Sequence, residues 1–247
     1  IILQTPNLSL AKGNNTAQSI RQEMAADNIS VGNLSSKKAS GYYLASKVSD
    51  MLNERAGELK NQQVTYSATE HVLTSDLTQP ITGRDDQDLV AAAKKFTTNA
   101  QNVINGTQYV YAAPLSSKSA LVFVQKTKYG VIAEEKGQLI FEINNNKIAK
   151  YTQSYQNQLT IVREKQETIS AEQAVSNLYM FSQLPGDTSI ESAELGYTEL
   201  TQVKEQTIFI PTWIVKIKNK NTGNIQFKEV NAFNGTVIAL NQNSNLK

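Results

Sequence analysis

An order of predicted helices and strands that occurs twice along the chain most constrains its fold. Residues 86–162 and 168–240 each begin with an amphipathic helix and continue with several short strands, separated by turns that contain Asn or Gly. A similar phrase lies near the end of each segment, because Glu-Ile-Asn at 142–144 and Glu-Val-Asn at 229–231 both precede a turn and a further strand. Helices followed by runs of strands are typical of α+β folds. We therefore predict an α+β protein with two related units, each a helix packed on a mainly antiparallel sheet.

Both predicted helices have recognisable starts and ends. The first follows a break at residues 80–88, which hold Pro, Gly and three Asp, and it is predicted to end at Asn105-Gly106. Its apolar face consists of Leu89, Ala93, Phe96, Ala100 and Val103. The second begins at Ser170, with Gln173 at capping-box spacing, and is predicted to end before Pro185-Gly186. Its apolar face consists of Ala174, Leu178 and Phe181.

These helices set the expected domain boundaries. Residues 85–165 form the first α+β unit, and residues 166–247 form the second. Residues 1–84, whose patterns predict irregular structure with short helices and strands, form an N-terminal region that packs on the first unit.

Composition excludes several classes of function. With 24 basic and 22 acidic residues the net charge is +2, which gives the chain no broad attraction for nucleic acid. The chain has no Cys and one His, so thiolate and multi-histidine metal sites are excluded. No nucleotide-binding glycine motif is present. We therefore predict neither a metal nor a cofactor.

No residue pattern predicts catalysis. His71 lies in a predicted strand edge without a nucleophile motif nearby, so a surface or packing role is favoured. Asp85, Asp86 and Asp88 lack the spacing of a calcium loop and precede a helix, where acidic side chains cap free N–H groups. The adjacent Glu134 and Glu135 would face opposite ways in a strand and are better placed in a turn.

The single tryptophan lies in a strongly apolar predicted strand, IFIPTWIVKI. Trp213, Val215 and Ile217 would share one face of this strand. A core anchor is the favoured interpretation of Trp213, with a binding platform for a peptide or partner strand as the alternative. Pro211 favours an edge strand or a bulge, and an edge strand can accept a strand from another protein.

Fragments in order along the chain resemble one protein family. The C-terminal unit carries AELGY at 193–197, PTW at 211–213 and VNAFNGTV at 230–237, which look like the last domain of YycI proteins and are broadly similar to PepSY-type domains. The fragment GQLIFEINNNKIAKYTQSY at 137–155 is similar to the middle of the family. Three further fragments resemble the N-terminal part of the family: GYYLASK at 41–47, LKNQQV at 59–64 and LTSDLTQPI at 73–81.

The resemblance implies a regulator rather than an enzyme. Proteins of the YycI family have one N-terminal membrane helix and an extracytoplasmic domain, and they act with the related protein YycH on the sensor kinase WalK, also called YycG, which controls cell-wall metabolism. The family has no known catalytic residues. No apolar run of about 20 residues is present, and the chain begins at Ile1 without Met. We therefore expect a membrane anchor to precede Ile1.

Two surfaces are predicted to bind a partner. They are the apolar strand with Pro211, Trp213, Val215 and Ile217, and the hairpin tip with Phe233, Asn234 and Gly235. Two other functions stay open. A groove between the two predicted units could hold a peptide, glycan or lipid fragment, which a deep apolar pocket with converging polar groups would favour. A carboxylate-based hydrolase would need two acidic side chains facing each other across a cleft.

Overall fold

A computed structural model describes residues 13–238 of the chain. Residues 1–12 of the predicted N-terminal region, and residues 239–247 with the end of the last predicted strand, lie outside the described range. The α-helices are α1 (Gly13–Ala26), α2 (Met51–Glu54), α3 (Asp86–Thr97) and α4 (Ala171–Met180). Short 3-10 helices are η1 (Ala56–Glu58), η2 (Gly106–Gln108), η3 (Ala113–Leu115) and η4 (Glu135–Gly137).

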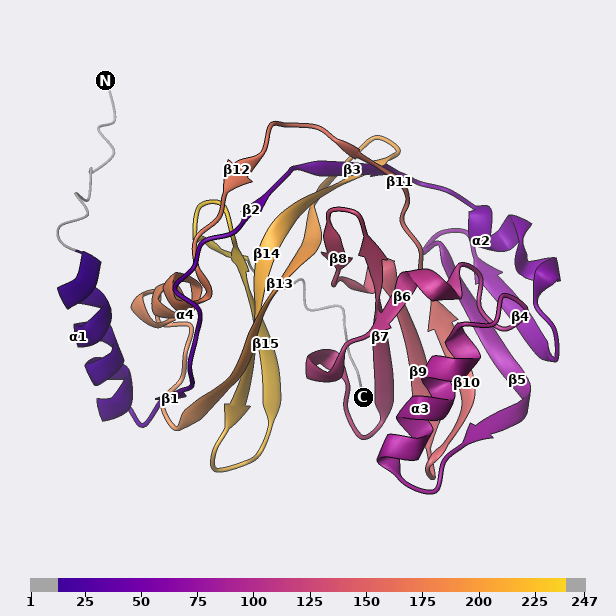
Figure 1. The fold of residues 1–247 in the computed structure, drawn as a ribbon, viewed down its shortest axis with the longest axis horizontal. Helices are drawn as coiled ribbons and strands as arrows, with labels where there is room; N and C mark the ends of the chain where they lie inside the picture. Colours follow the sequence, from indigo (N-terminus) through magenta and orange to yellow (C-terminus); the bar gives the residue numbers. More distant parts are fainter. Residues whose placement is uncertain (1–12, 239–247) are drawn as a thin grey trace. The chain divides into compact units, whose positions relative to one another are not determined.

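Strands make up most of the regular structure, and the predicted α+β class is confirmed (Figure 1). The first eight are β1 (Ser30–Val31), β2 (Ser40–Gly41), β3 (Leu44–Lys47), β4 (Gln62–Ser67), β5 (Val72–Thr82), β6 (Tyr109–Tyr111), β7 (Ala120–Thr127) and β8 (Gly130–Ile132). The others are β9 (Gln138–Asn144), β10 (Lys147–Gln153), β11 (Asn157–Ile161), β12 (Gln166–Glu167), β13 (Thr188–Val203), β14 (Gln206–Asn219), β15 (Ile225–Asn231) and β16 (Val237–Ile238).

The chain divides into two compact units, and neither is continuous in sequence. Unit 1 consists of Ile1–Lys38, Ile169–Glu194 and Trp213–Lys247. Unit 2 consists of Ala39–Thr168 and Leu195–Thr212. The long strands β13 and β14 each supply residues to both units. The sequence predicted three contiguous segments with boundaries at 84/85 and 165/166, and these boundaries stay a prediction. The second boundary lies close to the change of unit after Thr168.

The described part of the N-terminal region is shared between the two units, and the packing of residues 1–84 on the first predicted unit stays a prediction. Helix α1 and strand β1 belong to unit 1, whereas the chain from Ala39 belongs to unit 2. The physical reason lies in two contacts within unit 1. Arg21 of α1 forms an ion pair with Glu172 of α4 at 2.9 Å, and β1 pairs in parallel with β13 through Val31 and Ile190.

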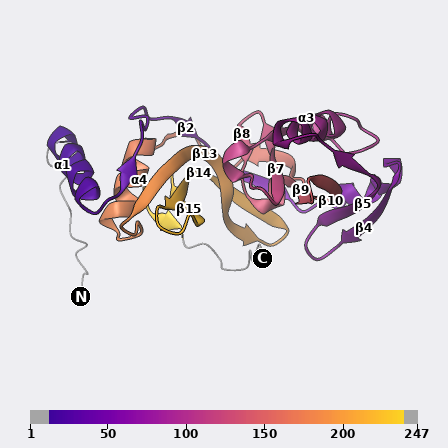
Figure 2. The ribbon, with the colours of Figure 1, turned by 90° about the horizontal axis from the view of Figure 1, so that it is seen from below.

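Unit 2 is built on a sheet covered by α3. The strand order is β11-β3-β14-β13-β8-β7-β9-β10-β5-β4, and β6 pairs with β7. The described registers are antiparallel except for β13 and β8, which pair in parallel at Tyr197 and Ile132. Figures 1 and 2 show α3 lying over one face of this sheet, near β9 and β10.

An aromatic cluster joins α3 to the sheet. The ring of Phe96 meets Phe141 edge-on at 6.1 Å and Tyr151 at 6.3 Å, and Phe141 meets Phe123 at 5.5 Å. Phe141 and Tyr151 are fully buried. Edge-to-face aromatic pairs contribute beyond their buried area, so this cluster is a principal contact between helix and sheet.

Helix α3 is shorter than predicted. It ends at Thr97, although Val103 is buried as the apolar periodicity indicates. Thr97 and Thr98 donate their hydroxyl groups to the carbonyls of Ala93 and Lys95, both at 2.8 Å. Side chains that bond the backbone locally compete with helix continuation. The predicted end at Asn105-Gly106 was wrong for this reason, and Asn105 instead adopts a left-handed conformation before η2.

Strand β5 passes through Pro80, which the sequence placed in a break between elements. The register with β4 reaches Leu77, and the register with β10 shifts between Asp76 and Ile81. Pro80 therefore occupies an irregular stretch of the ladder, where its missing N–H group is tolerated.

Helix α4 begins as predicted. Ser170 accepts a hydrogen bond from the backbone N–H of Gln173 at 3.1 Å, and the Gln173 side chain accepts from the Ser170 N–H at 3.2 Å, which completes a capping box. Phe181, predicted on the apolar face, is instead 58% exposed. The helix ends at Met180, so Phe181 leaves the helical face as the C-cap residue.

We predict that Gly106→Ala destabilises unit 2. A Cβ atom at this position would lie 1.8 Å from the carbonyl oxygen of Thr97, a backbone atom that cannot move aside. The expected loss is about 3 kcal/mol of unfolding free energy, measured by urea denaturation followed by circular dichroism.

Gly57→Ala is the matched control, because its Cβ would meet nothing within 4 Å. Equal denaturation midpoints for the two variants would contradict the close approach at Gly106.

Candidate functional site

The single histidine belongs to a hydrogen-bonded cluster at a turn. Tyr66 donates its hydroxyl to Asp50 at 2.7 Å and lies 3.1 Å from His71 Nδ1, which is 3.2 Å from Asp50. The bond from Tyr66, followed by that from His71, lowers the pKa of Asp50, and burial raises the pKa of Tyr66. Both neighbours meet the same ring nitrogen, whereas a catalytic relay uses both nitrogens of the imidazole. The arrangement fits the packing role predicted for His71.

Asp85 is the N-cap residue of α3, as the sequence predicts, and Asp86 and Asp88 lie in the first turn of the helix. Asp85 accepts a hydrogen bond from the backbone N–H of Asp88 at 2.8 Å, and Asp88 accepts one from the side chain of Arg84 at 2.9 Å. Asp86 is exposed in the first turn. Among residues 13–238, no cluster of three or more His, Asp or Glu side chains is placed to hold a metal ion.

Glu134 is the carboxylate with the most perturbed surroundings. Its side chain accepts a hydrogen bond from the backbone N–H of Glu199, and Glu199 in turn pairs with Lys136. Glu135 is exposed in η4, so the two glutamates do not form a facing pair. Burial raises the pKa of Glu134 above its usual range, partly offset by the hydrogen bond.

We predict that Glu134→Gln makes the protein more stable at neutral pH. The raised pKa means that the folded state favours the protonated carboxyl, so its contribution is present at low pH and lost as pH rises through the folded pKa. Gln keeps the acceptor oxygen without the charge. Unfolding midpoints measured between about pH 4 and 7 should fall less for the variant than for the parent chain.

Glu135→Gln serves as the control, because its side chain is exposed. A variant curve for Glu134→Gln that parallels the parent over the same pH range would contradict the assigned cause.

Four of the predicted partner-binding residues are buried. Trp213 is 7% exposed, Val215 and Ile217 are fully buried, and Pro211 is also buried. Pro211 favoured an edge strand or a bulge. Strand β14 as a whole is not an edge strand, because it is bonded to β3 and β13 and also pairs with β15, whereas a bulge at Pro211 stays a prediction. Its register with β3 ends at Phe209, two residues before Pro211. The tryptophan indole donates to the carbonyl of Ile169 at 3.0 Å, as a core anchor would.

The predicted hairpin tip lies at the surface of unit 1. Asn234 is exposed, Phe233 is half-buried and Gly235 is buried. The tip is held by local bonds: Asn231 accepts from the backbone N–H of Phe233 at 2.9 Å, and Asn177 of α4 donates to the carbonyl of Gly235, also at 2.9 Å. The tip is therefore a preorganised loop whose backbone is fixed against α4.

An apolar surface that the sequence did not single out lies at the end of α4. Met180 is 55% exposed and Phe181 is 58% exposed. Phe181 follows Asn177 by four residues and donates its N–H to the Asn177 carbonyl at 2.9 Å, so it lies one turn beyond the residue that holds the hairpin tip. The two surface elements together are called the α4–tip surface (Met180, Phe181 and residues 233–235). Helical periodicity had assigned Phe181 to the core, so no sequence signal marked it.

We predict that Trp213→Phe lowers stability by about 1–3 kcal/mol, because the indole bond to Ile169 is lost and a buried ring shrinks. Chemical denaturation followed by circular dichroism measures this loss. Leu200→Ala, at an exposed position, is the comparison and should change stability little. An equal effect of both variants would contradict the anchoring role of Trp213.

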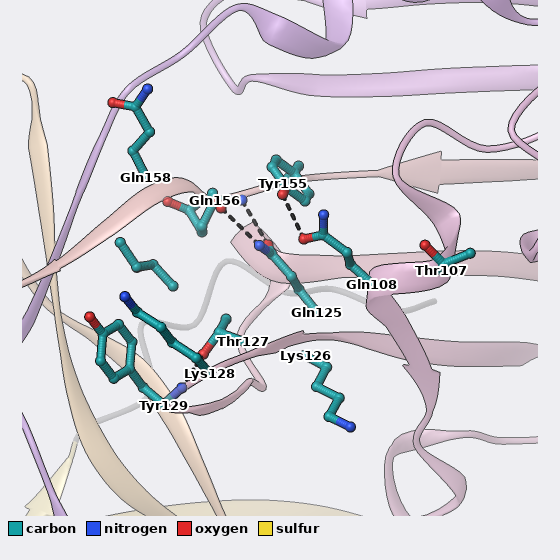
Figure 3. Close-up of a pocket in the computed structure, with 11 residues that line it drawn as sticks. Thr107, Gln108, Gln125, Lys126, Thr127, Lys128, Tyr129, Tyr155, Gln156 and Gln158 are labelled. Atoms are coloured by element: carbon teal, nitrogen blue, oxygen red, sulfur yellow. Dashed lines mark hydrogen bonds between the residues drawn. The ribbon is translucent and has the colours of Figure 1, made fainter.

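Unit 2 carries a pocket of about 520 Å³ (Figure 3). Its wall comes from η2, from the end of β7 and the turn that follows, and from the segment leading into β11. The lining residues are Thr107, Gln108, Gln125, Lys126, Thr127, Lys128, Tyr129, Tyr155, Gln156, Gln158 and Leu159. Most of these side chains are polar, so this is not the deep apolar pocket that was expected to favour a site for a peptide, glycan or lipid fragment.

Hydrogen bonds made by glutamine side chains hold the lining of this polar pocket in place. Gln125 is 2% exposed, and its side-chain amide both donates to and accepts from the backbone of Gln156, each at 2.8 Å. Tyr155 donates its hydroxyl to the Gln108 side chain at 2.7 Å, and Gln156 donates to the carbonyl of Lys136 at 2.7 Å. Figure 3 shows the hydrogen bonds between Gln125 and Gln156 and between Tyr155 and Gln108 as dashed lines. Tertiary contacts assemble the pocket, so no motif in the sequence announced it.

Comparisons with known proteins give one family match and distant structural likenesses. A search of curated proteins found no match. A crystal structure described as an uncharacterized protein from Eubacterium rectale ATCC 33656 gives a TM-score of 0.47 at 11% identity, covering 87% of this chain and 91% of the other. The Bacillus megaterium YpeB C-terminal domain gives a TM-score of 0.38 at 12% identity, covering 92% and 95%. No helix within residues 13–238 is long and apolar enough to cross a membrane.

The family model matches nearly the whole described fold. It is the model for the YycI protein, and it covers residues 9–233, which include α1 to α4 and every strand from β1 to β15. The match spans both units and confirms the resemblance found in the sequence fragments. The chain belongs to the YycI family.

Proposed function

We propose that this chain is a non-catalytic extracytoplasmic domain that, together with a YycH-type protein, modulates the sensor kinase WalK. The observation that carries the proposal is the family match over residues 9–233. Membership of the YycI family implies a role in regulating the WalK (YycG) system. Both neighbours of His71 meet the same ring nitrogen, and Glu134 and Glu135 do not face each other as a catalytic pair would. Both features are consistent with a role that needs no catalytic group.

A non-catalytic regulator acts by binding with different affinity to two states of the kinase. A domain that binds one state more tightly shifts the equilibrium by its difference in affinity. The family places a membrane helix before such a domain, and we propose that this helix makes the main contact with WalK. The soluble surface is then available to the YycH-type partner.

We propose that the α4–tip surface contacts the YycH-type partner. Met and aromatic side chains are enriched at the centres of protein interfaces, and Met180 and Phe181 present both types at the surface of unit 1. The hydrogen-bonded hairpin tip beside them costs little ordering on binding. Pro211, Trp213, Val215 and Ile217 are buried, so we do not propose them as contacts for the partner.

We expect a defined complex when this chain is mixed with the extracytoplasmic domain of a YycH-type protein, measured by size-exclusion chromatography and titration calorimetry. Phe181→Ser should weaken binding about tenfold, because a central aromatic contact contributes more than about 1 kcal/mol.

Ile225→Ser is the matched control. Ile225 is 51% exposed, similar to Phe181, but it lies at the start of β15, whereas the tip follows the end of that strand. Equal affinity of the Phe181→Ser variant and the parent chain for the YycH-type partner would contradict the proposal that the α4–tip surface is the binding site. Absence of any complex at tens of micromolar would count against the partner itself as a ligand of the soluble domain.

A further inference from the structure

The polar pocket of unit 2 has the charge of an anion-binding site. Its lining includes Lys126 and Lys128 but no Asp or Glu. Both lysines are exposed, and Lys128 Nζ lies 4.9 Å from the centre of the Tyr129 ring. Figure 3 shows the two side chains leaving the same segment in different directions, with Lys128 beside Tyr129. A ligand in this pocket therefore meets positive charge without a carboxylate to oppose it.

The rest of the lining offers amide and hydroxyl groups to a polar ligand. The side-chain oxygen of Gln108 accepts a hydrogen bond from Tyr155, so its amide nitrogen can donate to a ligand. The side-chain nitrogen of Gln156 donates to the carbonyl of Lys136, so its amide oxygen can accept from a ligand. Within the described residues, the Gln158 side chain makes no hydrogen bond. Paired donors and acceptors of this kind match vicinal hydroxyl and acetamido groups.

Strand β11 is distorted where Gln158 and Leu159 border the pocket. The register between β11 and β3 shifts between Asn157 and Thr160, and Gln158 has a φ of 50°, in the left-handed region. A non-glycine residue there is strained, and bulges commonly redirect side chains beside binding sites. Leu159 packs on the cluster of Leu44, Ile132, Tyr197 and Phe209, which holds the bulge in place.

Size and aromatic content narrow the ligand class. A pocket of about 520 Å³ is in the usual range for small-molecule sites. The rings of Tyr129 and Tyr155 are half-buried and supply flat apolar faces against which a sugar ring can pack. Tyr129 is fixed by an edge contact with Tyr42 at 5.8 Å.

We propose that this pocket binds an acidic saccharide, a mono- or disaccharide that carries a carboxylate. The carboxylate pairs with Lys128, the sugar ring packs against a tyrosine, and the unused amide nitrogen of Gln108 and amide oxygen of Gln156 bond its hydroxyl groups. The pocket shares no residue with the α4–tip surface, so the inference does not depend on the YycH-type partner.

Titration calorimetry and NMR with two matched probes test the proposal. An N-acetylated disaccharide that contains a uronic acid should bind saturably and perturb the backbone signals of residues 125–129 and 155–159. N,N′-Diacetylchitobiose, of similar size but neutral, should bind at least tenfold more weakly. Equal affinities for the two, or no saturable binding of the uronic acid probe at millimolar concentration, would overturn the proposal.

Substitutions locate the site. Lys128→Gln should weaken the acidic probe about tenfold, whereas Lys118→Gln, an exposed lysine outside the lining, should leave it unchanged. Equal losses from Lys118→Gln and Lys128→Gln would overturn the site.

Glycerol phosphate is the final probe, because it carries an anion without a sugar ring. Binding at least tenfold weaker than that of the acidic disaccharide supports recognition of the ring. Binding as tight as that of the disaccharide would show a general anion site and overturn the saccharide assignment.

Discussion

Burial of strand β14 on both faces is the constraint on which the remaining structure depends. Residues 209–215 are buried without interruption, so this stretch cannot show the alternation of a strand with one wet face. A strand buried in this way must have its backbone groups paired, and β14 is bonded to β3, β13 and β15. The tryptophan at its centre then needs a partner for the indole N–H, which the carbonyl of Ile169 provides just before α4. The start of α4 is thereby tied to the strand.

Local patterns predicted the elements of the fold where a single physical signal dominated. The capping box at Ser170 fixed the start of α4, and apolar runs bounded by turn residues located β7, β9 and β10 within a few residues. Prediction failed where side chains competed with the backbone or where pairing overrode a local signal. Thr97 and Thr98 ended α3 early, and an irregular ladder absorbed Pro80 within β5. Pro211 suggested an edge because the sequence alone does not reveal which strands flank it.

The candidate sites were less accessible to sequence reasoning than the fold. Phe181 has the spacing of a core residue, and only the end of the helix at Met180 places it at the surface. The pocket combines residues from η2, the β7–β8 turn and β11, which are separated by up to about fifty positions and meet through the sheet. Its one local signal is the run of amide side chains at 153–158, and a polar run of this kind predicts a loop as readily as a site. The negative findings for catalysis were simpler, since one His and no Cys limit the available chemistry.

The discontinuous make-up of the two units has a consequence for biogenesis. Unit 2 includes residues 195–212, and unit 1 includes the chain from residue 213 onward, so neither unit is complete when the first 168 residues have been synthesised. Domains that are contiguous can fold one after another as they emerge, whereas these two must wait for the same late hairpin. A nascent chain would hold β3 and β8 without their β14 and β13 neighbours until that hairpin arrives. Premature termination anywhere before residue 212 would therefore leave both units unfinished, and both stay exposed to proteases and to aggregation until that hairpin has been synthesised.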